Sequence, residues 1–220
     1  MQSEMLMKIK RKSVDPIPEK VVLKMAMETT AFSDDIGNVV TPINVVRDTS
    51  KAFQGTSSAK FDGSINSYLM VANNNDFNLG SLECCIEFAA SLDAISDLAW
   101  VPLNMRSVSG ADGFLFYGST TSMAFYIGNT LVLSMNSTFE SGFLNHFAVT
   151  RKANDWTMWF NGNPVASVNA NYTFAPCPEA IFLGKNSANN RNFHKGNSDI
   201  VRITRGHYRY DAPFVPGADW

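Results

Sequence analysis

The sequence predicts an all-β fold, a sandwich of antiparallel sheets. From residue 20 onward, short apolar runs alternate with clusters of Gly, Asn, Asp and Ser, which is the pattern of strands joined by turns. Several runs alternate apolar and polar residues with period 2, whereas a sustained helical period is lacking. The 220 residues are 45% hydrophobic and 17% charged, which suits one domain with a substantial core.

The expected strands follow the apolar runs in chain order. They are residues 21–27, 58–62, 67–71, 82–92, 98–103, 113–117, 123–127, 130–135, 146–151, 157–160, 165–168, 181–183 and 199–204. Many of these runs have the usual length of sandwich strands.

The alternation indicates which side chains face inward. Phe147 and Val149 share one side of their strand, opposite His146, and Val201 and Ile203 share one side of theirs. Successive side chains of a strand point to opposite faces of the sheet. We therefore expect two sheets that are each buried on one face.

Two pairs of turn residues join neighbouring strands. The Gly-Asn pair at 128–129 and the Asn-Gly pair at 161–162 have the spacing of two-residue hairpin loops. Such loops need a positive φ, which Gly and Asn adopt readily. They predict antiparallel meanders, and we expect the strands 157–160 and 199–204 to pair in the centre of the domain.

Composition excludes several classes of function. The formal net charge is -2 and the pI is about 5.9, so no general attraction to nucleic acid or an anionic membrane is expected. Cys84, Cys85 and Cys177 form neither a disulfide framework nor a metal motif. The sequence shows no signal peptide and no apolar run of membrane-spanning length, so we expect a soluble protein made in the cytoplasm.

The first residues differ from the rest in charge. Residues 1–24 hold six Lys or Arg against three acids, whereas acids exceed bases in the remainder. Pro16 and Pro18 favour an extended chain. We expect an arm at residues 1–19, outside a sandwich at residues 20–220, or alternatively a loose tail without a role. The basic residues that would anchor the arm to a partner are Lys8, Lys10, Arg11 and Lys12.

The C-terminal half carries a family resemblance. The segments are LNHFAVTR at 144–151, WTMWFNGNPV at 156–165, IFLG at 181–184 and GNSDIVRITRGHYRYDAPFVP at 196–216. Together they resemble laminin G-like domains of the concanavalin A-like lectin/glucanase superfamily. A looser match, beginning with AKFDG at 59–63, extends the resemblance over about residues 20–216.

The resemblance implies a jelly-roll sandwich of two antiparallel sheets. The segment 196–216 is similar to members found in bacteriophage virion proteins. This implies a virion structural protein, a capsid decoration or tail accessory protein that docks on other virion proteins through its arm and forms a homo-oligomer. The alternative is a glycan-binding adhesin module of a phage tail.

An enzyme is not expected. The glucanase branch uses carboxylates in a Glu-x-Asp-x-x-Glu run, and glycosidases need two acids flanking the bond that they cleave. Glu83 and Glu87 are the nearest candidates, but Cys85 stands where the central acid belongs. We therefore expect both glutamates to face solvent. His146 is expected to hydrogen-bond within the sandwich.

Other binding chemistry is weighed from residue type. Asp34, Asp35 and Asp76 lie in oxygen-rich loops, which makes calcium an open alternative to a chain without a metal or cofactor. Exposed aromatic rings could stack on sugar rings. The candidates for this contact are Trp100, Tyr117, Tyr126, Trp156 and Trp159.

Near the end of the chain, Tyr208, Tyr210 and Phe214 are expected to pack back against the sandwich.

Overall fold

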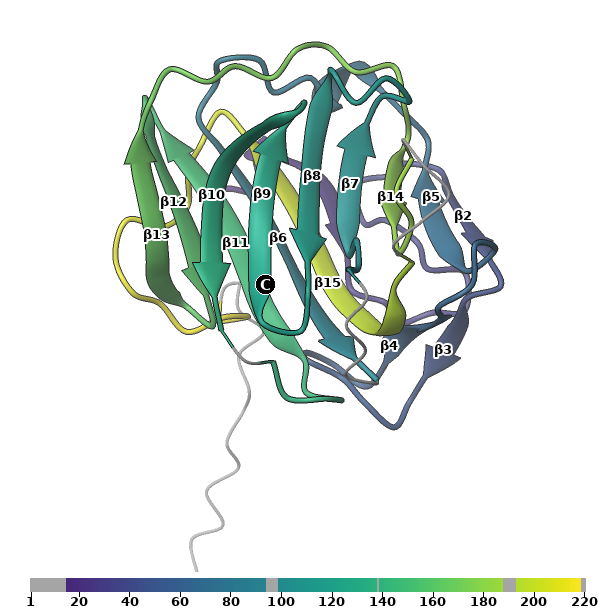
Figure 1. The fold of residues 1–220 in the computed structure, drawn as a ribbon. Coiled ribbons are helices and arrows are strands. Elements are labelled where there is room, and N and C mark those ends of the chain that lie inside the picture. Colours follow the sequence, from purple (N-terminus) through teal and green to yellow (C-terminus); the bar gives the residue numbers. More distant parts are fainter. Residues whose placement is uncertain (1–14, 94–98, 138, 188–192, 219–220) are drawn as a thin grey trace, which may run out of the picture.

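The computed structural model describes residues 15–93, 99–137, 139–187 and 193–218, and within them the chain forms two antiparallel sheets packed face to face (Figure 1). The predicted fold class, an all-β jelly-roll sandwich, is confirmed. Short 3-10 turns at Pro18–Lys20 and Asn75–Phe77 are the helical elements among the described residues.

We call the sheet at the back of Figure 1 sheet A. Its order is β13-β12-β11-β6-β15-β4-β3, and β1 also pairs with β15. The strands are β1 (Val21–Met25), β3 (Val46–Asp48), β4 (Ser58–Asp62), β6 (Cys84–Leu92), β11 (Asn145–Lys152), β12 (Asp155–Phe160), β13 (Asn163–Asn169) and β15 (Lys195–Arg205).

The sheet at the front of Figure 1 is sheet B. Its order is β10-β9-β8-β7-β14-β5-β2. The strands are β2 (Val40–Ile43), β5 (Tyr68–Val71), β7 (Leu103–Arg106), β8 (Gly113–Gly118), β9 (Ser122–Ile127), β10 (Thr130–Asn136) and β14 (Ile181–Leu183).

Aromatic rings fill the space between the sheets. Phe88 of sheet A meets Phe116 of sheet B edge to face, with ring centroids 4.9 Å apart. Phe147 stacks on Phe88 at 5.3 Å, so the predicted inward side of its strand is confirmed. Such rings prefer these offset and edge-to-face arrangements and bury large apolar areas.

Both predicted hairpin loops are present. Phe160 pairs with Asn163 across the loop of Asn161 (φ 49°) and Gly162 (φ 80°). Two successive positive φ angles match the twist of the flanking strands, as in type I′ turns. The loop at 128–129 also joins β9 to β10 with two residues, of which Gly128 has a positive φ of 54° and Asn129 does not.

The structure corrects three expectations about strands. The strands 157–160 and 199–204 do not pair, because β11 and β6 lie between them in sheet A. The strand expected at 98–103 begins only at Leu103, although Trp100 forms an isolated bridge with Gly118. The sequence also missed β2 and β3, which have only four and three residues.

The alternation predicted that one face of each sheet is exposed, but the outer face of sheet A is largely covered. Its central strands β6 and β15 are buried on both faces over most of their length. The C-terminal segment, residues 206–218, crosses the outer face and is drawn in yellow in Figure 1. Phe53 covers the neighbouring part of this face, over Ala89 and Ile200. The polar side chains under this cover form the first candidate site.

Candidate functional site

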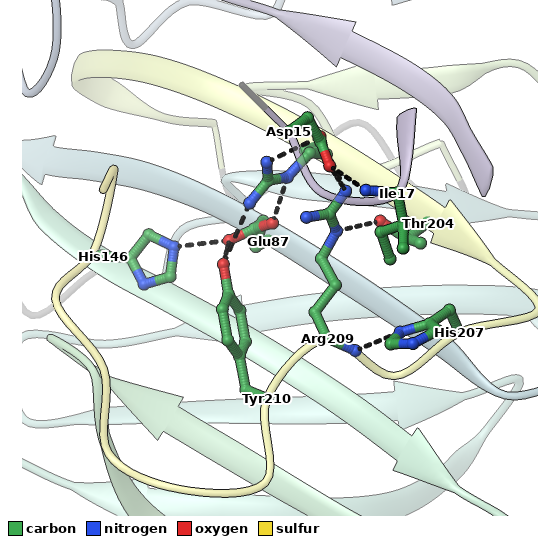
Figure 2. A network of polar contacts seen from close by, with 9 residues as sticks. Asp15, Ile17, Glu87, His146, Thr204, His207, Arg209 and Tyr210 are labelled. Carbon is green, nitrogen blue, oxygen red and sulfur yellow. Dashed lines mark hydrogen bonds and ion pairs between the residues drawn. The ribbon is translucent and has the colours of Figure 1, made fainter. Parts of the chain in front are cut away.

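A buried carboxylate lies at the centre of the outer face of sheet A. Glu87 of β6 is only 1% exposed, so the prediction that it faces solvent is wrong. Its Oε1 accepts a hydrogen bond from Arg202 Nε at 2.6 Å. Its Oε2 accepts one from the Tyr210 hydroxyl at 2.8 Å and lies 3.0 Å from His146 Nε2. Figure 2 shows His146 and Tyr210 both pointing toward this carboxylate.

A second carboxylate extends the network to the N-terminal side of the chain. Asp15 accepts from Arg202 Nη1 at 3.1 Å and from Arg209 Nη2 at 2.7 Å. Arg209 Nε in turn donates to Thr204 Oγ1 of β15 at 2.6 Å. Asp15, Glu87, Arg202, Arg209 and Tyr210 thus form one network, which we call the clasp (Figure 2).

The charges of the clasp balance. Burial disfavours the ionised form of Glu87, but Arg202 and the hydrogen bond with His146 outweigh it and lower the pKa of this carboxyl to about 2. Burial likewise opposes ionisation of Asp15, and the bonds to Arg209 and Ile17 leave its pKa lowered. Two carboxylates therefore face two guanidinium groups, and the clasp holds the C-terminal segment and Asp15 onto sheet A.

This geometry is structural rather than catalytic. Glu87 is buried, and Arg202, His146 and Tyr210 already contact its two oxygens, so it is not accessible to a substrate. A general acid in a glycosidase needs a raised pKa, whereas the pKa of Glu87 is lowered. His146 hydrogen-bonds within the sandwich, as expected. His194 is buried against Trp100, and burial lowers its pKa to about 4.

Aromatic packing covers the clasp. The ring of Phe214 stacks on Tyr210 with centroids 3.6 Å apart and meets Trp159 at 5.6 Å. The prediction that Tyr210 and Phe214 pack back against the sandwich is confirmed. Tyr208 lies further out, beneath the ammonium of Lys152 at 4.6 Å.

The structure separates the five aromatic residues considered for glycan contact. Trp100, Trp156 and Trp159 are 2%, 0% and 3% exposed. Each indole N–H is used internally, by Ser119 O, Ala170 O and Thr150 Oγ1 respectively. These three tryptophans therefore have little open ring face for a sugar.

The other two aromatic residues lie on the outer face of sheet B. Tyr117 of β8 and Tyr126 of β9 are diagonal neighbours, because Leu115 pairs with Tyr126 and Tyr117 pairs with Ala124. Diagonal side chains on one face are about 7–8 Å apart and can contact one ligand. Both tyrosines are partly exposed, and Leu131, opposite Tyr126 on β10, is 48% exposed. We call Tyr117, Tyr126 and Leu131 the tyrosine platform.

Polar groups border the tyrosine platform. Arg106 at the end of β7 donates to Gly110 O at 3.1 Å and to Asn129 in the loop between β9 and β10. Ser134 of β10 lies opposite Ala124, on the same face as the tyrosines. The sequence signal that could have found this site is the alternation of buried and outward side chains in β9, which places Tyr126 on the outward face.

The loops considered for calcium are held by protein groups. Asp34 accepts from Lys24 N at 2.6 Å and from Asn38 N at 2.9 Å. Asp35 is exposed, and Asp76 lies 3.7 Å from Arg205. Among the described residues, no three His, Cys, Asp or Glu side chains gather where they could hold a metal ion.

The proposed anchoring residues Lys8, Lys10, Arg11 and Lys12 lie outside the described residues. The last part of the expected arm is not detached, because Asp15 is buried in the clasp.

Within the described parts of the chain, no helix has the length and apolar character to cross a membrane.

No protein-family model matches the chain, and no curated protein matches its sequence. Solved structures do match its fold. They include the binding domain of Paraclostridial Mosquitocidal Protein 1 (TM-score 0.70, 13% identity, 87% of this chain and 50% of that one). The binding domains of botulinum neurotoxin serotypes D and G give TM-scores of 0.68 and 0.65 at 13% and 11% identity, each over 86% of this chain and 49% and 48% of theirs.

The chain therefore spans about half the length of the solved structures that it matches. At such identities the likeness concerns the arrangement of strands and not the binding residues. It agrees with the two-sheet sandwich described above.

Proposed function

We propose that this chain is a non-catalytic binding module that recognises a glycan on a cell-surface receptor through the tyrosine platform. The observation that carries this proposal is the pair of neighbouring, partly exposed tyrosines on the open face of sheet B. The other three candidates, Trp100, Trp156 and Trp159, are buried.

The chemistry of the platform suits a sugar ring. Phenol rings present an apolar face to the C–H groups of a pyranose and a hydroxyl at their polar end. The Arg106 guanidinium and the Asn129 amide lie beside the platform and can bond sugar hydroxyls. The matching solved structures are described as binding domains, which supports a binding role without identifying a ligand.

We further propose that the module serves a bacteriophage virion as a decoration or tail accessory protein. The support is the resemblance of the segment 196–216, which forms β15 and the C-terminal part of the clasp. Asp15 is held on the outer face of sheet A, opposite the tyrosine platform. An arm at residues 1–14 would then dock the protein on other virion proteins, or on further copies of this chain, while sheet B faces the cell.

A glycan array with the purified full chain tests the binding role. Wild-type protein should retain a defined glycan, and the double variant Tyr117→Ala/Tyr126→Ala should bind it at least about tenfold more weakly, a loss of about 1.4 kcal/mol. Phe143→Ala is the matched control, because Phe143 is 63% exposed and lies outside the platform. Equal binding by the double variant would contradict the assignment of this site.

A particle-assembly assay tests the virion role separately. A chain that lacks residues 1–14 but keeps Asp15 should melt like wild type and fail to join particles. Normal incorporation of this truncated chain would rule out anchoring through the arm.

A further inference from the structure

A groove lies on the outer face of sheet A, beyond the clasp. It has a volume of about 340 Å³ and is lined by β11, β12 and β13 on one side and by residues 210–213 on the other. Ligand pockets in proteins begin at about 300 Å³, so the groove has room for a small ligand. It is on the opposite sheet from the tyrosine platform.

A row of hydroxyl groups crosses the floor of the groove. Thr150 of β11 pairs with Thr157 of β12, which pairs with Ser167 of β13, so the three side chains share one face. The Thr150 hydroxyl accepts from Trp159 Nε1 at 2.9 Å. The hydroxyls of Thr157 and Ser167 have no hydrogen-bond partner among the described residues. Two adjacent groups are thus free to both donate and accept.

The remaining lining limits the charge of a ligand. Lys152 pairs loosely with Asp211 at 3.7 Å, and both side chains are more than half exposed. Asp155 adds a second carboxylate. The groove therefore carries more negative than positive charge, which disfavours anionic ligands.

Apolar surfaces complete the groove. Pro164 and Pro213 line it together with Tyr210, which the clasp holds in place. A ligand that fits this lining has many hydroxyls, no negative charge and a ring with C–H groups on its faces.

We propose that this groove binds a neutral monosaccharide unit, independently of the tyrosine platform. The hydroxyls of Thr157 and Ser167 bond the sugar hydroxyls, and the proline and tyrosine surfaces contact its ring. A single sugar held by a few exposed groups binds weakly, with a Kd on the order of 1 mM.

Saturation-transfer NMR on the full chain tests this site with defined probes. The neutral probes are the methyl glycosides of glucose, galactose and mannose, and N-acetylglucosamine; the anionic probe is sialic acid. At least one neutral probe should receive saturation, and sialic acid should receive none. A signal from sialic acid alone, or from none of the probes, would overturn the proposal.

Two variants locate the signal. Ser167→Trp fills the groove from an exposed position of β13 and should weaken binding at least tenfold, and Thr157→Val removes one hydroxyl and should weaken it several-fold. The matched control is Ser81→Trp, at an exposed position that lines neither the groove nor the tyrosine platform. Unchanged binding by Ser167→Trp would refute the site. The variant Tyr117→Ala/Tyr126→Ala should keep the groove signal, so failure at one site is distinguishable from failure at the other.

Discussion

The outer faces of the two sheets differ in how far the chain covers them. On sheet A, the chain covers its own surface with the C-terminal segment, and the clasp beneath it satisfies two carboxylates and two guanidinium groups internally. On sheet B, the part formed by β8, β9 and β10 leaves Tyr117, Tyr126 and Leu131 partly or largely exposed. The difference separates charged residues that stabilise the fold from aromatic residues that remain available to a partner.

The largest effect is expected where a clasp charge loses its partner. Glu87→Ala leaves Arg202 buried without one of its carboxylates, and breaking a buried ion pair in this way costs about 3–5 kcal/mol. Urea denaturation should show this loss. Glu83→Gln, directly before the same strand and outside the network, is the control and should stay within about 0.5 kcal/mol of wild type. If Glu87→Ala were as stable as this control, the network would not be what holds the C-terminal segment onto sheet A.

The aromatic cover of the clasp should give the next largest effect. Tyr210→Ala removes a ring stacked on Phe214 and the hydroxyl bonded to Glu87, so a cost of about 3 kcal/mol or more is expected. Tyr210→Phe keeps the ring and loses the hydrogen bonds to Glu87 and Arg202, so it should cost about 1.5–3 kcal/mol and less than Tyr210→Ala. Thermal denaturation distinguishes the two variants. A larger loss for Tyr210→Phe than for Tyr210→Ala would contradict the packing.

Acid should unfold the protein through the buried groups of sheet A. The pKa of Glu87 is lowered from 4.5 to about 2, so its stabilisation is present above pH 4.5 and is lost as the pH falls toward 2. Burial also lowers the pKa of His194 from 6.5 to about 4, so its stabilisation is lost over that interval. Burial raises the pKa of Asp199 from 3.8 to about 6, which acts in the opposite direction between those values.

These opposing contributions predict a shallow pH dependence between about pH 6.5 and 4.5 and a steep loss of stability below it. Melting temperatures measured from pH 7 to pH 2.5 check this shape. In Glu87→Gln the steep part should be reduced, because the titrating carboxyl is gone. An unchanged acid limb in this variant would assign the loss to other groups.

The smallest effect on stability is expected on the open face. Tyr126→Ala removes a partly exposed ring from sheet B and should change the free energy of unfolding by about 0.5 kcal/mol or less, as most surface substitutions do. Calorimetry provides the measurement. A loss as large as that of Tyr210→Ala would mean that the platform is part of the core, and the contrast between the two faces would fail.

Local sequence patterns predicted the fold well, but they did not predict that the C-terminal segment covers the outer face of sheet A. Period-2 alternation placed Phe147 and Val149 correctly in the core. The expectation that Glu87 faces solvent is wrong, because a pattern within one strand does not show what a distant segment packs against it. Two partners of Glu87, Arg202 and Tyr210, are more than a hundred residues away in the chain, and the third, His146, is 59 residues away. The clasp therefore became visible only in three dimensions.

The site residues show the same limit. From residue type alone, Trp159 and Tyr126 were equally good candidates for contact with a glycan. In the structure, Tyr210 and Phe214 cover Trp159, whereas Tyr126 is partly exposed. The groove could not be found from sequence either, since Thr157 and Ser167 become neighbours only through the register of β12 and β13.

The position of β15 has a consequence for synthesis of the chain. β15 is made after all the other described strands, yet it lies inside sheet A and is hydrogen-bonded to β1, β4 and β6. Strands β7, β8, β9 and β10 of sheet B are neighbours in both sequence and space, so they can pair as soon as they leave the ribosome. Until β15 emerges, β1, β4 and β6 all lack this partner, and the growing chain exposes the unpaired edges of these three strands.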